Sequence, residues 1–288
     1  MWIFFAMGSA VFAGFVAILV KIGIKNVDST LATAIRTVVV VIFAWLMVFV
    51  VGSQAGIKTV EVKTLLALVL SGLATGGSWL FYFKALQIGD INKVVPVDKS
   101  SNVLTILLSL ALFREGFSIS KIAAVIAIGA GTYMMIERKE SAQKGETGLK
   151  WLLYAGLGAV FASLTAILGK IGIANIDSTL GTAIRTVVVL IMAWAIVLWQ
   201  GTAKQIKTID RKSWLFLGLS GFATGGSWLC YYRALQEGPA SIVVPIDKLS
   251  ILISIAFGYI VFRERLNRLP FIGLVLIVLG TLSLVIIG

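Results

Sequence analysis

Charged residues interrupt long apolar segments at matching depths, and they are the residues of this chain best placed to do chemistry. Arg36 and Asp98 each lie about seven residues into such a segment. In the second half of the chain, Arg185 and Asp247 occupy the corresponding places. Seven helical residues correspond to a depth of about 10 Å in a membrane, where an isolated charge is costly. The pattern predicts that each arginine pairs with the aspartate of its own half and that each pair gates a path across the membrane. The alternative is a static structural pair.

Uncharged polar side chains recur at helical spacing beside these charges. Residues 71–86 (SGLATGGSWLFYFKAL) carry them at i, i+4, i+7 and i+11, and residues 220–235 (SGFATGGSWLCYYRAL) repeat the pattern. This spacing aligns them on one helix face, which in a membrane must turn toward other helices or water. Interhelical hydrogen bonding, at about 0.6 kcal/mol per contact, is the alternative to a cavity. The residues predicted to line a substrate cavity are Thr75, Ser78, Tyr82, Lys99, Asn102, Thr105, Thr224, Ser227, Tyr231 and Lys248.

These features occur twice because the chain consists of two copies of one unit. A shift of 149 residues superimposes them without a gap, and residues 26–39 return as residues 175–188 with 12 of 14 positions identical. Each copy holds five long apolar segments, and an odd number of crossings forces the second copy to enter the membrane from the opposite face. The pattern predicts an all-α integral membrane protein with ten transmembrane helices in two inverted five-helix repeats. We expect the repeats at residues 1–139 and 151–288, joined by a polar linker at residues 140–150.

The composition requires lipid as the solvent for much of the surface. Hydrophobic residues make up 59% of the chain and charged residues only 13%, with a mean hydropathy of +1.00. A soluble protein of this size could not bury so much apolar surface. We therefore expect a multi-pass protein of the plasma membrane, the inner membrane of a bacterium. The predicted spans are residues 2–20, 31–51, 65–86, 94–113, 122–136, 151–169, 180–199, 214–235, 243–262 and 271–287.

The net charge of +12 is interpreted as a record of membrane orientation rather than of nucleic-acid binding. Of the 19 basic residues outside the spans, 14 lie on the side that holds the linker between the halves. This count places the linker in the cytoplasm and both termini outside. Glu115 and Glu264 are interpreted as interfacial anchors. The cations interpreted as reaching toward the lipid headgroups are Lys21, Lys84, Lys170 and Arg233.

Enzymatic and metal chemistry find no support in the sequence. The chain has no histidine and a single cysteine, Cys230, so the commonest general base, the commonest metal ligand and any disulfide framework are missing. It also has no phosphate-binding glycine loop and no nucleophile elbow. We therefore expect no enzyme activity, no metal and no cofactor.

Prolines and glycines indicate where helices bend or approach each other closely. Pro96 and Pro245 each precede an aspartate-lysine pair, and we expect each to disturb the first turn of its helix. Such exposed backbone groups beside charges are a common way to make a polar site in a membrane. Glycines in the fifth and tenth segments, among them Gly131 and Gly280, predict either close helix packing or dimer contacts.

The sequence resembles the drug/metabolite transporter superfamily, specifically its EamA-type ten-helix carriers. The resemblance covers both halves and rests on the paired third helices quoted above, the fourth helices KVVPVDKSSNVLTILLS and IVVPIDKLSILISIAFG, and the Phe-Arg-Glu endings. Each half alone also resembles small single-repeat EamA proteins. The resemblance implies a central cavity lined by the first four helices of each half, with the fifth and tenth helices at the periphery. It also implies ATP-independent export or exchange of small metabolites such as amino acids, and termini in the cytoplasm, opposite to the charge count.

The resulting hypothesis is an alternating-access secondary transporter for a small polar metabolite. The excess of cations around the predicted cavity favours an anionic or zwitterionic substrate. Proton coupling through Asp98 or Asp247 is left open, as is the choice between a monomer and a homodimer. The alternatives are a passive channel or facilitator, in which the charges form selectivity rings, and a non-transporting scaffold subunit. The expected partners are the lipid bilayer and the metabolite, and nucleic acid is not among them.

Overall fold

The chain folds into a helical bundle made of two units that follow one another in sequence. The computed structural model describes residues 1–23, 27–88, 94, 97–98, 100–113, 115, 118–135, 150–262 and 267–287. The first unit contains α1 (Trp2–Gly23), α2 (Ser29–Val51), η1 (Ser53–Thr59), α3 (Val62–Ile88), α5 (Ser101–Leu112) and α6 (Ile119–Met134). The second contains α7 (Lys150–Gly172), α8 (Ser178–Gln200), η2 (Thr202–Thr208), α9 (Arg211–Glu237), α10 (Ala240–Lys248), α11 (Ser250–Phe262) and α12 (Arg268–Ile287). Residues 140–149 of the predicted linker lie outside the described residues, and its last residue, Lys150, begins α7.

The ends of the second helix in each unit follow from residues that both copies share. Asp28 precedes α2, and its carboxylate accepts hydrogen bonds from the first backbone N–H groups of that helix. Asp177 caps α8 in the same way. Both helices end at a glycine in the left-handed region, Gly52 with φ 78° and Gly201 with φ 70°, where a side chain would be strained. Local sequence therefore sets the start and the end of these helices in both copies.

Within the described residues, seven helices are long and apolar enough to cross a membrane, so the chain is a multi-pass, all-helical membrane protein. α5 and α6 contain shorter apolar stretches. The ninth predicted span is one candidate crossing, Ala240–Phe257, but its helix is interrupted at Leu249 and therefore consists of α10 and α11. Pro245 lies inside α10 rather than in its first turn, and it supplies no N–H to the helical hydrogen bonds before the break. The equivalent Pro96 lies outside the described residues.

The two units pack as inverted copies, as the odd number of segments predicts. α6 and α12 are repeat equivalents, and they lie antiparallel against each other. A methyl group on Gly131 of α6 would lie 2.5 Å from the carbonyl oxygen of Gly273, and one on Gly280 of α12 would lie 3.0 Å from that of Ala124. Gly131 corresponds to Gly280 and Ala124 to Gly273, so each contact has its counterpart, as two-fold pseudosymmetry requires. These glycines serve close packing within one chain.

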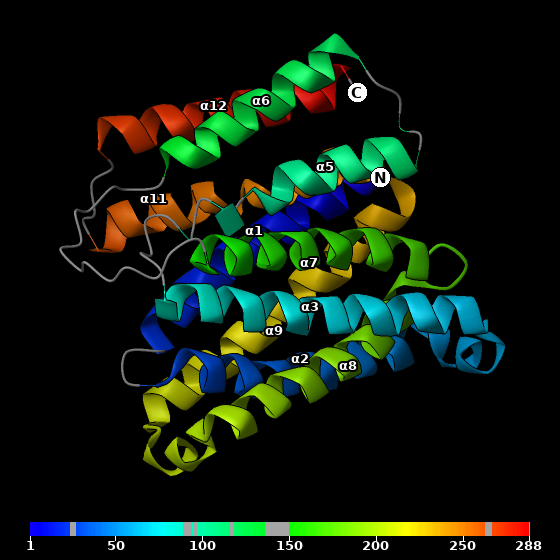
Figure 1. Ribbon diagram of the computed structural model, residues 1–288. Coiled ribbons are helices and arrows are strands. Elements are labelled where there is room, and N and C mark those ends of the chain that lie inside the picture. Colours follow the sequence, from blue (N-terminus) through cyan, green and yellow to red (C-terminus); the bar gives the residue numbers. More distant parts are fainter. Residues whose placement is uncertain are drawn as a thin grey trace.

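Helices of one unit pack mainly on helices of the other. α3 lies on α7, α1 on α9, and α2 on α8. Figure 1 shows the helices as successive rows, from α6 and α12 at one edge to α2 and α8 at the opposite edge, with both termini at the same end of the bundle. The glycine pairs of the third helices make room for this packing: Gly77 lies against Phe161, and Gly226 lies against Phe12 at the equivalent place. The interface between the units therefore runs through the middle of the molecule.

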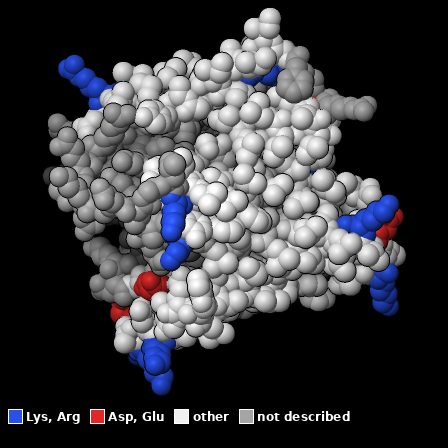
Figure 2. All heavy atoms as spheres, in the orientation of Figure 1, with Lys and Arg blue, Asp and Glu red and all other residues white. Residues whose placement is uncertain are grey.

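The surface fits a membrane setting. In Figure 2, the charged side chains of the visible face lie mainly toward the two ends of the helices, and uncharged surface fills the centre of the view. Large apolar side chains such as Phe49, Trp199 and Ile260 are more than half exposed. Lipid tails solvate such groups without the cost that water imposes, so the exposed apolar belt requires no protein partner to cover it.

Candidate functional site

A polar chamber lies at the interface between the two units, and it has two lobes. The Arg36 lobe has a volume of about 330 Å³ and is lined from α1, α2, α3 and α9. The Arg185 lobe has a volume of about 360 Å³ and is lined from α1, α3, α7, α8, α9 and α10. Ala13, Trp79, Ser227 and Trp228 line both lobes. Since Trp79 and Trp228 are repeat equivalents, the shared wall lies near the pseudosymmetry axis.

Arg185 is buried in the wall of its lobe, with only 2% of its surface exposed. Its Nε donates to Ser71 Oγ at 2.9 Å, and its Nη2 donates to Thr75 Oγ1 at 2.6 Å. The guanidinium also lies 5.1 Å from the ring centre of Trp228 and 5.0 Å from that of Tyr232, within reach of cation–π attraction. Nη1 is buried without a hydrogen-bond partner among the described residues. Two nitrogens of the guanidinium are therefore hydrogen-bonded, and the third has no partner among the described residues.

Arg36 repeats part of this arrangement in the other lobe. Its Nη2 donates to Thr224 Oγ1 at 2.7 Å, the counterpart of the bond between Arg185 and Thr75. Its Nε is buried and has no partner within the described part of the chain. The hydroxyl of Ser220, which corresponds to Ser71, donates to the carbonyl of Leu217 at 2.7 Å. The two lobes are thus built from equivalent residues that adopt different hydrogen-bonding states.

Asp247 brings negative charge into the Arg185 lobe from α10. Its Oδ1 accepts from the Ser9 hydroxyl at 2.6 Å, and its Oδ2 accepts from Lys248 Nζ at 3.2 Å. Ser9 also contacts Ser227 at 3.2 Å between hydroxyl oxygens, so α1, α9 and α10 meet here. The residue equivalent to Ser9 in the second unit is Gly158, which has no hydroxyl to offer. The polar network around this aspartate is therefore particular to one half.

The structure gathers most of the predicted cavity residues in the chamber. Arg36, Thr224 and Ser227 line the first lobe, and Thr75, Ser78, Arg185, Ser227, Tyr231, Asp247 and Lys248 line the second. Asp98, Tyr82, Asn102 and Thr105 are not among the residues that line these two lobes, and Lys99 lies outside the described residues.

The hydrogen bonds of Arg36, Arg185 and Asp247 involve residues other than their predicted gate partners. Arg185 and Asp247 share a lobe, yet the arginine bonds hydroxyls of α3 and the aspartate bonds Ser9 and Lys248. Arg36 likewise bonds Thr224 of the opposite unit. Gating by arginine–aspartate pairs stays a prediction. In this conformation the arginines connect the two units.

Sequence reasoning missed several residues of the chamber. Trp79 and Trp228 line both lobes, and Thr33 and Thr37 line the first. The signal was present for the tryptophans, because the motif GGSW occurs in both copies beside the predicted serine. Thr165 also went unnoticed; its hydroxyl lies 3.3 Å from that of Thr75.

Glu115 positions α10, and therefore Asp247, from the opposite unit. Its carboxylate accepts hydrogen bonds from the backbone N–H groups of Ala240 at 2.8 Å and Ser241 at 2.9 Å, which are the first residues of α10. A carboxylate at a helix N-terminus satisfies unpaired donors and favours the helix dipole. The interpretation of Glu115 as a surface anchor is wrong, because its side chain is only 9% exposed. Glu264, its counterpart, lies outside the described residues.

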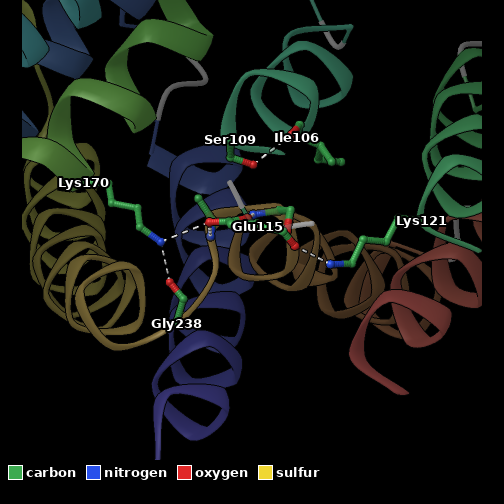
Figure 3. Close-up of polar contacts among 8 residues, drawn as sticks. Ile106, Ser109, Glu115, Lys121, Lys170 and Gly238 are labelled. Carbon is green, nitrogen blue, oxygen red and sulfur yellow. Dashed lines mark hydrogen bonds and ion pairs between the residues drawn. The ribbon is translucent and has the colours of Figure 1, made fainter. Parts of the chain in front are cut away.

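Lys170 and Lys121 complete this cluster (Figure 3). Lys170 Nζ lies 3.3 Å from Glu115 Oε1 and donates to the carbonyl of Gly238 at 2.6 Å, so it does not extend toward headgroups as expected. Lys121 Nζ donates to the backbone carbonyl of Glu115 at 2.7 Å. Burial by itself would raise the pKa of Glu115, but hydrogen bonds from Ser241 and Ala240 and the charge of Lys170 together hold it below its usual value.

The other cations interpreted as reaching headgroups have different surroundings. Arg233 is 43% exposed and pairs with Glu237 one turn along α9, at 2.6 Å. Lys84 is exposed, and the side chain of Lys21 is outside the described part of the structure. Across the residues that the structure describes, no three His, Cys, Asp or Glu side chains gather as a metal site would require.

Comparison with known proteins shows that both halves of the chain match one protein family. Residues 1–137 and 149–286 each match the EamA-like transporter family. A protein of Sinorhizobium sp. named "Uncharacterized transporter in cobO 3'region" is 46% identical over 134 residues, which is 46% of this chain and 95% of that protein. The "Uncharacterized transporter YxxF" of Bacillus subtilis is 25% identical over 222 residues, or 74% of this chain and 68% of that protein.

A solved crystal structure shares the fold. Its TM-score is 0.79 at 16% sequence identity, and the alignment covers 99% of this chain and 96% of the other. The Sinorhizobium relative matches about half of this chain over nearly its whole length, which agrees with a tandem of two units. The inverted helical units, the chamber between them and the two family matches lead to one conclusion: the chain belongs to the EamA-like transporter family and is a multi-pass membrane transporter.

Proposed function

We propose that this protein is a secondary, ATP-independent transporter that exports or exchanges a small polar metabolite by alternating access. The observation that carries the proposal is the chamber between the inverted units, whose two lobes present equivalent arginines, Arg36 and Arg185. In inverted-repeat transporters the substrate site lies at the repeat interface near the middle of the membrane, and one unit rocks against the other. The chamber is lined from both repeats, which supports this proposal.

The difference between the two lobes supports two exchangeable states. Within the described part of the chain, Arg185 bonds both Ser71 and Thr75, whereas Arg36 bonds Thr224 alone. Equivalent residues in unlike states are expected when two homologous units adopt different conformations, because exchanging those conformations yields the state that opens to the opposite face. In the exchanged state, Arg36 would take the bonding pattern that Arg185 has here.

The cluster at the N-terminus of α10 supplies a contact that must change during such a cycle. Glu115 of the first unit and Lys170 of the second hold the start of α10 together. Because α10 carries Asp247 into the chamber, release of this contact would move a charge of the substrate site. The gates predicted from Asp98–Arg36 and Asp247–Arg185 would then form as charge-assisted pairs in the states that this structure does not occupy.

The test is transport in proteoliposomes loaded with a metabolite library, with efflux identified by mass spectrometry. Wild-type protein should release at least one small polar compound without ATP, and empty liposomes should not. Asp247→Asn should reduce that flux at least tenfold, because Ser9 and Lys248 lose the charge that they bond. Asp210→Asn is the matched control, since Asp210 caps α9 on the exposed surface away from the chamber. Equal flux in wild type and Asp247→Asn would remove this aspartate from the mechanism.

Counterflow separates a carrier from a passive channel. A carrier should move labelled substrate inward faster when unlabelled substrate is present inside, because the loaded chamber returns across the membrane. A channel would show no such acceleration, and a scaffold subunit would show no flux at all. A repeat of the assay with an imposed pH gradient tests proton coupling: coupled flux should depend on the gradient and lose that dependence in Asp247→Asn.

A further inference from the structure

A buried cation in the wall of the chamber has one nitrogen without a partner among the described residues. Arg185 is 2% exposed, and two of its three guanidinium nitrogens bond neutral hydroxyls. The third, Nη1, has no hydrogen-bond partner among the described residues, although the side chain lines the lobe. An unsatisfied N–H on a buried charge is costly, so such a group in a chamber wall calls for an acceptor inside the chamber.

The acceptors of the protein around it are already engaged. Asp247 is the carboxylate that lines the same lobe, and both of its oxygens accept hydrogen bonds from other residues, Ser9 and Lys248. Among the described residues, the charged side chains that line this lobe are Arg185, Lys248 and Asp247, and together they carry a net charge of +1. One negative group on a ligand would balance this charge, whereas a ligand with no net charge or a positive charge would not.

The geometry favours a planar acceptor. Bonds to Ser71 and Thr75, together with the rings of Trp228 and Tyr232, fix the plane and the position of the guanidinium. A guanidinium held in this way is pre-organised for a carboxylate, which matches its planar array of donors. Trp79 and Trp228 line both lobes and offer apolar surface to the body of the ligand. A lobe of about 360 Å³ is at the small end of organic-ligand sites.

We propose that the transported compound is a small carboxylate and that Arg185 binds its carboxylate group through Nη1. This inference rests on the proposed transport function and specifies the substrate class for the same chamber. It names a monoanion, because one negative charge balances the net charge of +1 that the described residues bring to this lobe. Arg185 is thus the specificity-determining residue in the conformation that this structure shows.

The direct test is ligand binding by the purified full chain, measured as thermal stabilisation and tryptophan fluorescence. The probes are acetate, propionate and benzoate, their neutral amides, glycine and inorganic phosphate, all at constant ionic strength. At least one carboxylate should raise the melting temperature and change the emission of the chamber tryptophans, while its amide should do neither. Stabilisation by an amide equal to that by its acid would overturn the proposal, as would binding of phosphate or glycine in preference to all three carboxylates.

Substitutions assign the binding to Arg185. Arg185→Gln should abolish carboxylate binding, and Arg185→Lys, which keeps the charge but loses the planar donors, should weaken it at least tenfold. Arg233→Gln is the control, because Arg233 pairs with Glu237 away from the chamber. If the glutamine variant does not fold, the lysine variant decides, since its unliganded melting temperature can be compared with wild type first. Unchanged carboxylate affinity in Arg185→Lys would contradict the assignment of the binding site to Arg185.

The two proposals fail separately. If the wild-type chain transports a neutral or cationic compound and binds no carboxylate, transport stands and the carboxylate inference is wrong. If carboxylates bind and Arg185→Gln abolishes binding, but no compound crosses proteoliposomes, the Arg185 site stands and the transport proposal is wrong.

Discussion

Arg185 and Thr75 are joined by a 2.6 Å hydrogen bond that crosses between the two repeats, from α8 to α3. The equivalent bond from Arg36 to Thr224 crosses in the opposite sense at 2.7 Å. Each unit thus holds an arginine of the other. The donor and the acceptor of each bond belong to different repeats. Any rocking of one unit against the other must therefore strain or break these bonds.

Replacing Thr75 with valine keeps the shape of the side chain but removes the acceptor of Arg185 Nη2. A buried cation that loses a hydrogen bond costs about 1–3 kcal/mol, so the melting temperature in detergent should fall clearly. Thr105→Val is the matched control, because the hydroxyl of Thr105 is also buried but donates only to the Ser101 carbonyl within α5. A loss of stability in Thr105→Val as large as that in Thr75→Val would contradict the special role of the contact between repeats.

The carboxylate of Glu115 should make part of the stability depend on pH. Since its pKa is lowered in the folded state, its contribution is present above the ordinary glutamate value of about 4.3 and is lost as the pH falls through the folded pKa. We expect the wild-type melting temperature to decline below about pH 4.5 and Glu115→Gln to show a flatter acid limb with a lower value at pH 7. Thermal scans from pH 3 to pH 8 measure both. Glu237→Gln, which removes a carboxylate paired on the surface with Arg233, should keep the wild-type profile.

Close packing of α6 on α12 leaves no room for a side chain at Gly131. A methyl group there would lie 2.5 Å from the Gly273 carbonyl oxygen, and backbone atoms cannot turn aside as a side chain can. Gly131→Ala should therefore destabilise the protein by about 1–3 kcal/mol. Gly156 in α7 has no atom within 4 Å of the same position, so Gly156→Ala should be neutral or stabilising by up to about 1 kcal/mol. Equal melting temperatures for the two alanine variants would show that α6 and α12 do not meet as described.

A cysteine introduced at Gly8 should form a disulfide with Cys230, the single cysteine of the chain. The Cβ of residue 8 would lie 4.0 Å from Cys230 Cβ, within the range of about 3.5–4.5 Å that a disulfide requires. The bond would connect α1 of the first repeat to α9 of the second. With a protease site inserted between residues 139 and 150, cleaved Gly8→Cys protein should stay whole on a non-reducing gel and separate after reduction.

The control for this cross-link is Gly8→Cys combined with Cys230→Ser, which keeps the new thiol and removes the single native one. It should separate into two fragments under both conditions. Separation of cleaved, oxidised Gly8→Cys would contradict the packing of α1 on α9 and, with it, the interleaving of the two repeats.

The sequence alone determined the repeat, the inversion and the depth of the charges. Hydropathy is a local property of the chain, so the positions of apolar segments and of Arg36, Asp98, Arg185 and Asp247 within them follow from residue order. The helix ends at Asp28 and Gly52 likewise depend on neighbouring residues, and the second copy repeats them. An odd number of segments then requires inversion, which the antiparallel contact of α6 with α12 confirms.

Only the tertiary structure decided which residues meet. The sequence gives the depth of a charge in the membrane but not which helix lies beside it. It therefore did not reveal that Arg36 donates to Thr224 of the opposite unit. Contacts such as Gly77 with Phe161 place α3 against α7. α3 in turn carries the Ser71 hydroxyl that accepts from Arg185. Neighbour choice depends on the complementarity of whole helix surfaces, which are formed by residues far apart in the chain, whereas depth depends on a single stretch of residues.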